Sequence, residues 1–267
     1  MTHPLVFDKV IGKGTHGVVY AGYHKQLERI VAIKKVRDTL SSRHEVSAIQ
    51  QVQGCANVVK YYSTYIDKED DSLLMVMELC DGTPTDKIVA NVRQGNRLSE
   101  HTVRTVAQGV ANALLHCHER QLLYGDMKPS NIICGLNGEA KLIDFGCTRK
   151  GLAYTSPLGT PLYFAPEKFS HDFGLPSDVW SFGIVLYMLV AGHHPFVHTP
   201  HYGKKLLSGL DELHSDIEAT ALTFHHPHWD GISDSLKDLI ACTLRKDARK
   251  RMAIEYVVAH DWWSANL

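Results

Sequence analysis

The sequence predicts an α+β fold with a β-rich N-terminal lobe and a helical C-terminal lobe. Up to about residue 80, short β-branched stretches separated by glycine or polar turns are typical of strands. After Asp81-Gly82 the apolar residues recur at helical spacing instead. The 267 residues are therefore expected to form one domain over 1–267, with an N-lobe at about 1–80, a hinge at 78–82 and a C-lobe at about 83–267.

Five strands and one helix are expected in the N-lobe. The helix is predicted over residues 43–52, where Val46, Ile49 and Val52 fall on one face. The strand segments are rich in β-branched or aromatic residues and end at polar turns. They cover residues 6–11, 18–22, 30–36, 58–66 and 73–79.

The C-lobe is expected to contain helices and one small hairpin. Residues 98–118 form a long amphipathic pattern with Ser99 as its candidate N-cap. Two short strands, at 132–133 and 141–143, flank Asn137-Gly138, a pair that favours a type I′ turn. Residues 180–190 are apolar almost all round, which predicts a central buried helix. Two further helices are predicted at 233–244 and 253–260.

Charge and composition argue against several classes of partner. Lys and Arg total 28 and Asp and Glu total 29, so no basic excess points to nucleic acid or to an anionic membrane. The longest apolar stretch, 180–191, is shorter than the ~20 residues that a membrane helix needs. Met1-Thr2-His3-Pro4 has no basic region followed by an apolar run and no glycine at position 2, so neither a signal peptide nor myristoylation is expected. Six cysteines without CxxC spacing are interpreted as free buried thiols of an intracellular protein. A cytoplasmic location is expected, with the nucleus as the alternative.

Three glycines lie between the first two predicted strands. Gly12, Gly14 and Gly17 would let backbone amides come close to phosphate oxygens. An ordinary hairpin turn is the alternative for this motif alone. A dinucleotide-binding loop fits poorly, because no helix follows.

A lysine at the end of an apolar strand needs an anion. Lys34 follows Val31-Ala32-Ile33, and phosphates could supply that anion while a helix carboxylate holds the ammonium. Glu45 on the next helix is the candidate, with a solvated helix residue as the alternative. The short interval between Lys34 and Glu45 predicts that the helix starts late.

The densest group of chemically useful residues lies further along the chain. Phosphoryl transfer to a hydroxyl needs a proton acceptor, a cation and oxygen ligands for a metal. Asp126 is the candidate base and Lys128 the candidate cation. Asn131 and Asp144 are the candidate metal ligands. A solvated turn would explain Asp126 alone but not the whole set.

The order of these motifs resembles the protein kinase signature set. Ala165-Pro166-Glu167 completes it, after the glycine motif, Val31-Ala32-Ile33-Lys34, Asp126-Met127-Lys128-Pro129-Ser130-Asn131 and Asp144-Phe145-Gly146. The chain is thus similar to a eukaryotic protein kinase catalytic domain over about residues 7–263. Lys128-Pro129 and residues 159–163 resemble the serine/threonine branch.

The resemblance implies a bilobal protein kinase-like fold, ATP with Mg²⁺ (or Mn²⁺) as cofactors, and a protein substrate. It implies an ATP site made of Ile11, Gly12, Gly14, Gly17, Val19, Ala32, Lys34, Glu45, Met77, Glu78, Cys80 and Ile133. Adenine would lie between Val19 and Ala32 above and Ile133 below. Met77 would be the gatekeeper, and the hinge hydrogen bonds would come from the backbone of Glu78 and Cys80. The implied catalytic residues are Asp126, Lys128, Asn131 and Thr160, the metal ligands Asn131 and Asp144, and the structural residues Glu167, Asp178 and Arg251.

The sequence departs from the family at the catalytic loop. It reads Tyr124-Gly125-Asp126 where the family usually has His-Arg-Asp, so it is of the non-RD type. The arginine that normally meets an activation-loop phosphate is missing, so phosphorylation of acceptors such as Thr155 and Ser156 is expected to matter little. Cys147 is either a reactive thiol beside the ATP site or a small packing residue, and the second is the simpler interpretation.

Substrate preference and competing functions also follow from the resemblance. Ser130 and Met188 stand where arginine-directed kinases carry glutamates, so no arginine preference is expected. A pseudokinase scaffold is the main alternative, but such scaffolds lose the residues that are kept here at Lys34, Asp126 and Asp144. A small-molecule kinase is the other, and residues 159–167 argue against it because they frame a protein-substrate groove. Regulators are expected to act in trans, and the sequence leaves the oligomeric state open.

Overall fold

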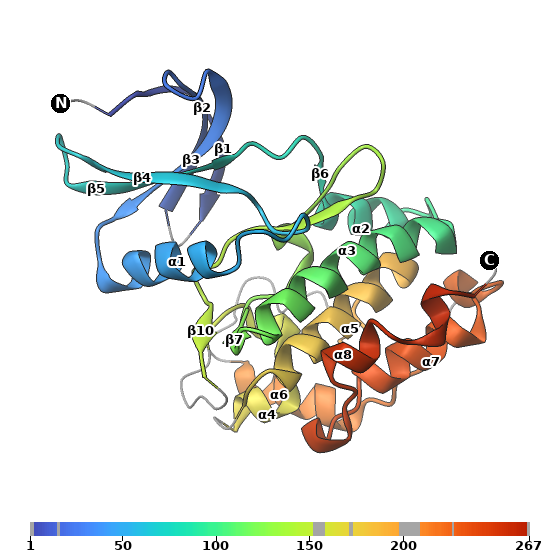
Figure 1. The fold of residues 1–267 in the computed structure, drawn as a ribbon. Coiled ribbons are helices and arrows are strands. Elements are labelled where there is room, and N and C mark those ends of the chain that lie inside the picture. Colours follow the sequence, from blue (N-terminus) through green and yellow to red (C-terminus); the bar gives the residue numbers. More distant parts are fainter. Residues whose placement is uncertain are drawn as a thin grey trace.

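The computed structural model describes residues 3–14, 17–151, 158–170, 173–197, 209–225 and 227–265. An antiparallel sheet with one helix forms the N-terminal part, and helices form most of the C-terminal part (Figure 1). The α+β fold expected from the sequence, with a β-rich N-lobe and a helical C-lobe, is confirmed.

The N-terminal sheet has the strand order β1-β2-β3-β5-β4. Side chains alternate between its two faces, as the period of a strand requires. Val31 and Ile33 of β3 pack with Leu74 and Val76 on one face, while Val36 belongs to a separate cluster on the other. The strands are β1 (Leu5–Gly14), β2 (Gly17–His24), β3 (Arg29–Arg37), β4 (Tyr61–Asp67) and β5 (Ser72–Glu78).

Two N-lobe boundaries differ from expectation. Helix α1 (Leu40–Gln51) begins three residues before the predicted 43, because Thr39 caps it by accepting a hydrogen bond from the Ser42 amide. The predicted first residue of this helix is therefore wrong by three positions. Strand β4 begins at Tyr61 rather than 58, because the Val59 amide donates to the carbonyl of Leu142 over 3.0 Å. This bond ties the N-lobe to the C-lobe.

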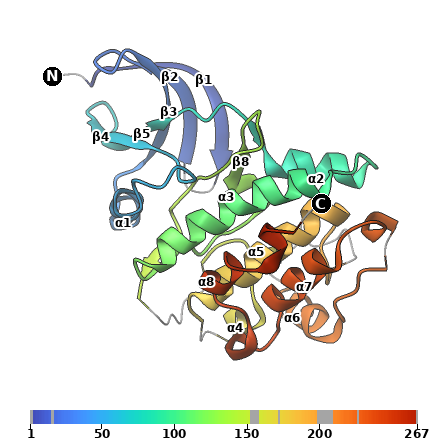
Figure 2. The same ribbon diagram turned by 45° about the vertical axis from the view of Figure 1, so that its right-hand side comes forward.

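The helical part is built around α5, whose residues from Ser177 to Ala191 are all buried. The predicted central helix is thus confirmed, and Figure 2 shows α3 running alongside it. Ser99 caps α3 as expected, accepting from the Thr102 amide over 3.1 Å. The helices are α2 (Thr85–Arg93), α3 (Glu100–His118), α4 (Pro166–Phe169), α5 (Pro176–Ala191), α6 (Leu210–Ala219), α7 (Asp234–Thr243) and α8 (Ile254–Val257).

Helices α2, α4 and α6 were not among those expected, and α8 is shorter than the predicted 253–260. The chain leaves α8 because His260 caps a following 3₁₀ turn, Asp261–Trp263, by accepting from the Trp262 amide. Nowhere in the described ranges is a helix both long and apolar enough to cross a bilayer.

The predicted hairpin is present as β8 (Ile132–Cys134) and β9 (Ala140–Leu142), with β6 (Thr83–Pro84) beside β8. Its turn is not type I′, which needs positive φ at both central residues. Only Gly138 is left-handed, at φ +84°, and its amide donates to the carbonyl of Gly135. Two short strands, β7 (Leu122–Leu123) and β10 (Arg149–Lys150), pair with each other in the C-terminal part.

Candidate active site

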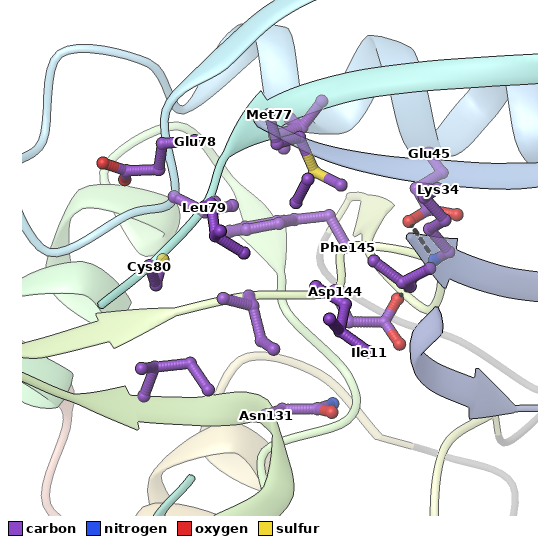
Figure 3. A pocket seen from close by; sticks show the side chains of 16 residues that line it. Ile11, Lys34, Glu45, Met77, Glu78, Leu79, Cys80, Asn131, Asp144 and Phe145 are labelled. Atoms are coloured by element: carbon purple, nitrogen blue, oxygen red, sulfur yellow. Dashed lines mark hydrogen bonds and ion pairs between the residues drawn. The ribbon is translucent and has the colours of Figure 1, made fainter. Parts of the chain in front are cut away.

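A pocket lies between the two lobes, and most of the predicted ATP-site residues line it (Figure 3). Glu78, Leu79 and Cys80 border one end of it, and Lys34 and Glu45 border the other. The remaining predicted residues on its wall are Ile11, Val19, Ala32, Met77, Asn131, Ile133 and Asp144. The predicted residues on the pocket wall come from five strands, helix α1, the 3₁₀ turn Pro129–Asn131 and two loops.

Five further residues line the pocket and were not predicted: Ile49, Val59, Leu79, Ile143 and Phe145. Phe145 belongs to the Asp144-Phe145-Gly146 motif, so the sequence did contain a signal by which it could have been predicted. Ile49 and Val59 are core residues in sequence terms, and nothing in their spacing distinguishes a pocket wall from packing.

The predicted glycines line the mouth of the pocket, together with Asp126, Lys128 and Thr160. The fold itself requires glycine only at Gly17, which has φ +128° and where a Cβ would meet the Lys35 carbonyl oxygen at 2.4 Å. A Cβ at Gly14 would meet nothing within 4 Å. Packing does not explain Gly14, whereas close approach of a ligand does.

Lys34, Glu45 and Asp144 meet at the inner end of the pocket. The Lys34 ammonium lies 2.5 Å from Oε1 of Glu45 and 2.9 Å from Oδ1 of Asp144. Burial opposes the charge on Lys34, but the two carboxylates outweigh that effect, so the pKa of Lys34 is raised. Burial also raises the pKa of Glu45, against the pull of the ammonium. A solvated Glu45, the alternative interpretation, is wrong because its side chain is only 7% exposed.

Asp144 adopts φ +59°, in the left-handed region that residues other than glycine enter rarely. This backbone turn points its carboxylate toward Lys34, while the next side chain, Phe145, enters the core. Phe145 packs edge-to-face on Tyr124, with ring centroids 5.3 Å apart. The Tyr124 hydroxyl donates to the carbonyl of Ile143, which fixes the start of the same turn.

Asp126 is the centre of a second polar group at the pocket mouth. Its Oδ1 accepts from the amide and the hydroxyl of Thr160, each over 2.8 Å. Its Oδ2 accepts from the Lys128 ammonium over 2.7 Å and from the Asn131 amide over 3.2 Å. Lys128 also donates to the Thr160 hydroxyl over 2.8 Å. The other three residues predicted as catalytic are therefore all brought into contact with Asp126.

The catalytic loop is held from below by Asp178 at the start of α5. Asp178 is 2% exposed and accepts from the backbone amides of Tyr124 and Gly125 over 2.8 and 2.9 Å. His118 Nε2 lies 2.9 Å from the same carboxylate. Since α5 is buried from Ser177 to Ala191, these bonds connect the loop to the buried core of the C-lobe.

Glu167 and Arg251 form a two-pronged ion pair, with contacts of 2.6 and 2.9 Å. The Arg251 side chain is fully buried and also donates to the carbonyl of Pro176. This pair fixes α4 against α5 and the segment before α8. Thr155 and Ser156, predicted as phosphate acceptors, lie outside the described residues.

Asn131 and Asp144 suit Mg²⁺ by the chemistry of their donors. The Asn131 amide nitrogen donates to the carbonyl of Asp126, which orients the amide and leaves its oxygen as the ligand atom. Carboxylate and amide oxygens are the ligands that Mg²⁺ prefers. Both residues line the same pocket and the same mouth.

Comparison with known proteins agrees with this geometry. Residues 5–263 match the protein kinase domain family, and the chain belongs to it. It is 31% identical over 265 residues to Calcium-dependent protein kinase 5 of Plasmodium falciparum, covering 95% of this chain and 44% of the relative. It is 30% identical over 261 residues to Serine/threonine-protein kinase PEPKR2 of Arabidopsis thaliana, covering 96% of this chain and 53% of the relative. It is 31% identical over 265 residues to Serine/threonine-protein kinase DCLK3 of Mus musculus, covering 95% of this chain and 32% of the relative.

The chain spans about half the length, or less, of the curated relatives that it matches. Protein kinases generally use ATP and Mg²⁺. The family and its fold are thereby established for this chain.

Proposed function

We propose that the chain is an active serine/threonine protein kinase of the non-RD type, which transfers the γ-phosphoryl group of Mg-ATP to protein hydroxyl groups. The observation that supports this most is that the pocket between the lobes has one polar group at its inner end and a second at its mouth. Lys34, Glu45 and Asp144 are joined inside it, and Asp126, Lys128 and Thr160 at its mouth.

The nucleotide would occupy the pocket between the lobes. Val19 and Ala32 would cover one face of adenine and Ile133 the other, with Met77 at the back and the backbone of Glu78 and Cys80 at the edge. Lys34 would bind the phosphates, positioned by Glu45. Asn131 and Asp144 would hold Mg²⁺, which neutralises charge on the phosphates when bound.

In the proposed step, Asp126 orients the substrate hydroxyl and accepts its proton. The hydroxyl oxygen forms a bond to the γ-phosphorus as the bond to the β,γ-bridging oxygen breaks, and ADP leaves. Lys128, held between Asp126 and Thr160, would stabilise charge on the transferred phosphoryl group. Thr160 would keep the Asp126 carboxylate in place through its two hydrogen bonds.

We propose further that the two lobes, about 1–80 and 83–267 with the hinge at 78–82, act as one catalytic domain. Proteins are the proposed substrates, and regulators are proposed to bind from outside this domain. Since the reaction draws on Mg-ATP, we place the chain inside the cell.

Transfer of ³²P from γ-labelled ATP to a generic protein substrate, with Mg²⁺, tests the proposal. Incorporation on serine or threonine is the expected result. Nucleotide binding without any transfer would indicate a pseudokinase scaffold instead. Transfer to small alcohols, without autophosphorylation or a protein product, would indicate a small-molecule kinase.

A further inference from the structure

A lysine next to the Glu167–Arg251 pair is almost completely removed from water. Lys168 is 3% exposed, in the short helix α4. Burial lowers the pKa of Lys168, although the surrounding acidic groups, Asp178 first, oppose that effect. A buried ammonium must place its hydrogens on acceptors. Here the acceptors are two backbone carbonyls, of Gly125 and Leu158, each 2.8 Å away.

These two carbonyls lie on the segments that supply the polar group at the pocket mouth. Gly125 directly precedes Asp126, and Leu158 is two residues before Thr160. Asp126 and Thr160 are joined by two hydrogen bonds. The Lys168 ammonium therefore connects the catalytic loop to the 158–160 segment immediately beside their functional contact.

The two segments approach so closely that no side chain fits between them. A Cβ at Gly159 would lie 2.4 Å from the Gly125 carbonyl oxygen, and Gly159 has φ +108°. Gly125 has φ +86°, and a Cβ there would lie 2.7 Å from the carbonyl oxygen of Cys147. A side chain at position 125 would collide with the backbone of these neighbouring segments. The cation that connects the catalytic loop to the 158–160 segment is instead Lys168 of α4.

The position of Lys168 is itself fixed by an ion pair of its neighbour and by two aromatic rings. Its neighbour Glu167 is fixed by the two contacts with Arg251. Its ammonium lies over the Phe164 ring, 4.3 Å from the centroid, and 5.4 Å from the centroid of Phe173. Cation–π contacts of this kind stabilise a desolvated charge.

We propose that Lys168 is a positioning residue that holds the 158–160 segment on the catalytic loop without any phosphate. Phosphorylation orders such a segment when the phosphate gains charge-assisted hydrogen bonds to fixed cations. Here a fixed cation makes the connection directly, through backbone carbonyls that no modification removes. The inference rests on the proposed kinase function, because its consequence for turnover passes through Asp126 and Thr160.

Lys168→Met keeps most of the side-chain volume and removes both hydrogen bonds. We expect kcat to fall by about tenfold or more, since small misplacements of catalytic groups have effects of up to ~10²-fold. The KM for ATP should stay unchanged, because Lys168 does not line the nucleotide pocket. Lys168→Arg keeps the charge and the donors, so it should recover part of the rate. Lys68→Met, at the exposed turn between β4 and β5 of the N-lobe, is the matched control and should behave as wild type.

Hydrogen exchange followed by mass spectrometry gives a readout that needs no activity. In Lys168→Met, exchange should rise at residues 125–128 and 158–160, including the Thr160 amide, and stay unchanged in α3 and α5. Gly159→Ala acts on the same contact with Lys168 intact, and should show the same local rise and the same loss of kcat. The Gly159→Ala variant also provides the test if Lys168→Met does not fold.

Phosphatase-treated wild-type protein should keep its rate within about twofold, a barrier change of ~0.4 kcal/mol. The inference is overturned if Lys168→Met keeps wild-type kcat and exchange, if exchange rises equally throughout the chain, or if phosphatase treatment abolishes activity. A wild-type protein without any transferase activity would refute the proposed kinase function instead. The hydrogen-exchange measurement would still test whether Lys168 holds the 158–160 segment on the catalytic loop.

Discussion

Thr160 donates both its backbone amide and its hydroxyl to one carboxylate oxygen of Asp126, each over 2.8 Å. The second carboxylate oxygen accepts from Lys128 and Asn131. Each of these four groups donates to the carboxylate, so both of its oxygens are oriented as acceptors. An accepting oxygen is what a general base needs to receive a proton from a substrate hydroxyl.

Asp126→Asn should lower kcat by about 10²–10⁴-fold, the usual effect of removing a general base. The new amide nitrogen would also face the Lys128 ammonium, a donor against a donor. ATP affinity, measured by titration calorimetry, should remain, because Asp126 lies at the mouth rather than in the adenine pocket. Asp230→Asn, an exposed aspartate far from the site, is the control. Wild-type turnover in Asp126→Asn would contradict the assigned role.

Lys34→Met should abolish activity and also destabilise the fold. Removing one partner of a buried ion pair costs about 3–5 kcal/mol, because the other charge stays buried. Glu45 has a pKa that burial already raises, so without Lys34 it takes up a proton more readily than in the unfolded chain. The folded state then binds more protons, and its stability falls as the pH rises from about 5 to about 8.

The double variant Lys34→Met/Glu45→Gln should recover part of the lost stability and flatten this pH dependence, yet remain inactive. Urea unfolding at the two pH values provides the measurement. A deficit for Lys34→Met that is the same at both pH values would show that Glu45 does not remain buried and titratable.

ATP should stabilise the protein much more with Mg²⁺ than without it. The triphosphate would lie next to the Asp144 carboxylate, and a metal on Asn131 and Asp144 removes that repulsion. Binding to the folded state raises the melting temperature, so thermal shifts with ATP in Mg²⁺ and in EDTA are compared. Asp144→Asn should lose the metal dependence. Equal shifts for the wild type in both buffers would argue against this pair as metal ligands.

The enzyme should show no preference for arginine upstream of the phosphorylated residue. Ser130 is exposed at the pocket mouth and carries no charge, and Met188 is buried in α5. Neither can attract a guanidinium group, and the chain's net charge is near zero. A positional peptide library provides the test. Strong selection of arginine two or three residues before the acceptor would show that other acidic residues face the peptide.

Cys80 and Cys147 should resist alkylation at neutral pH although both lie near the nucleotide site. Burial raises the pKa of each thiol to about 11. Only about 1 in 10⁴ of such thiols is a thiolate at pH 7, and the thiolate is the reactive form. Iodoacetamide labelling followed by peptide mass spectrometry should show Cys80 reacting only as the pH approaches 11. Fast labelling of Cys147 at pH 7 would support the reactive-thiol alternative.

Much of the fold and site could be predicted because the relevant signals are local. Strand and helix periodicity placed the five N-lobe strands and the buried α5, and the spacing of motifs identified the residues of the pocket. Errors arose where a distant contact overrides the local pattern. Val59 is β-branched, yet its amide bonds to Leu142 instead of continuing β4. The 253–260 helix ends early because His260 caps the next turn.

The sequence by itself determined the α+β architecture, the family and the identity of the residues at Lys34, Glu45, Asp126 and Asp144, since residue type and spacing carry that information along the chain. Only the tertiary structure decided which cation joins the catalytic loop to the 158–160 segment. Lys168 lies 43 residues away in sequence, and in the sequence alone it is one lysine among many. Its function as a bridge depends on burial and on two carbonyl groups brought within 2.8 Å, and backbone carbonyls are present at every position of a chain. Which of them face a buried charge is settled when distant segments pack together.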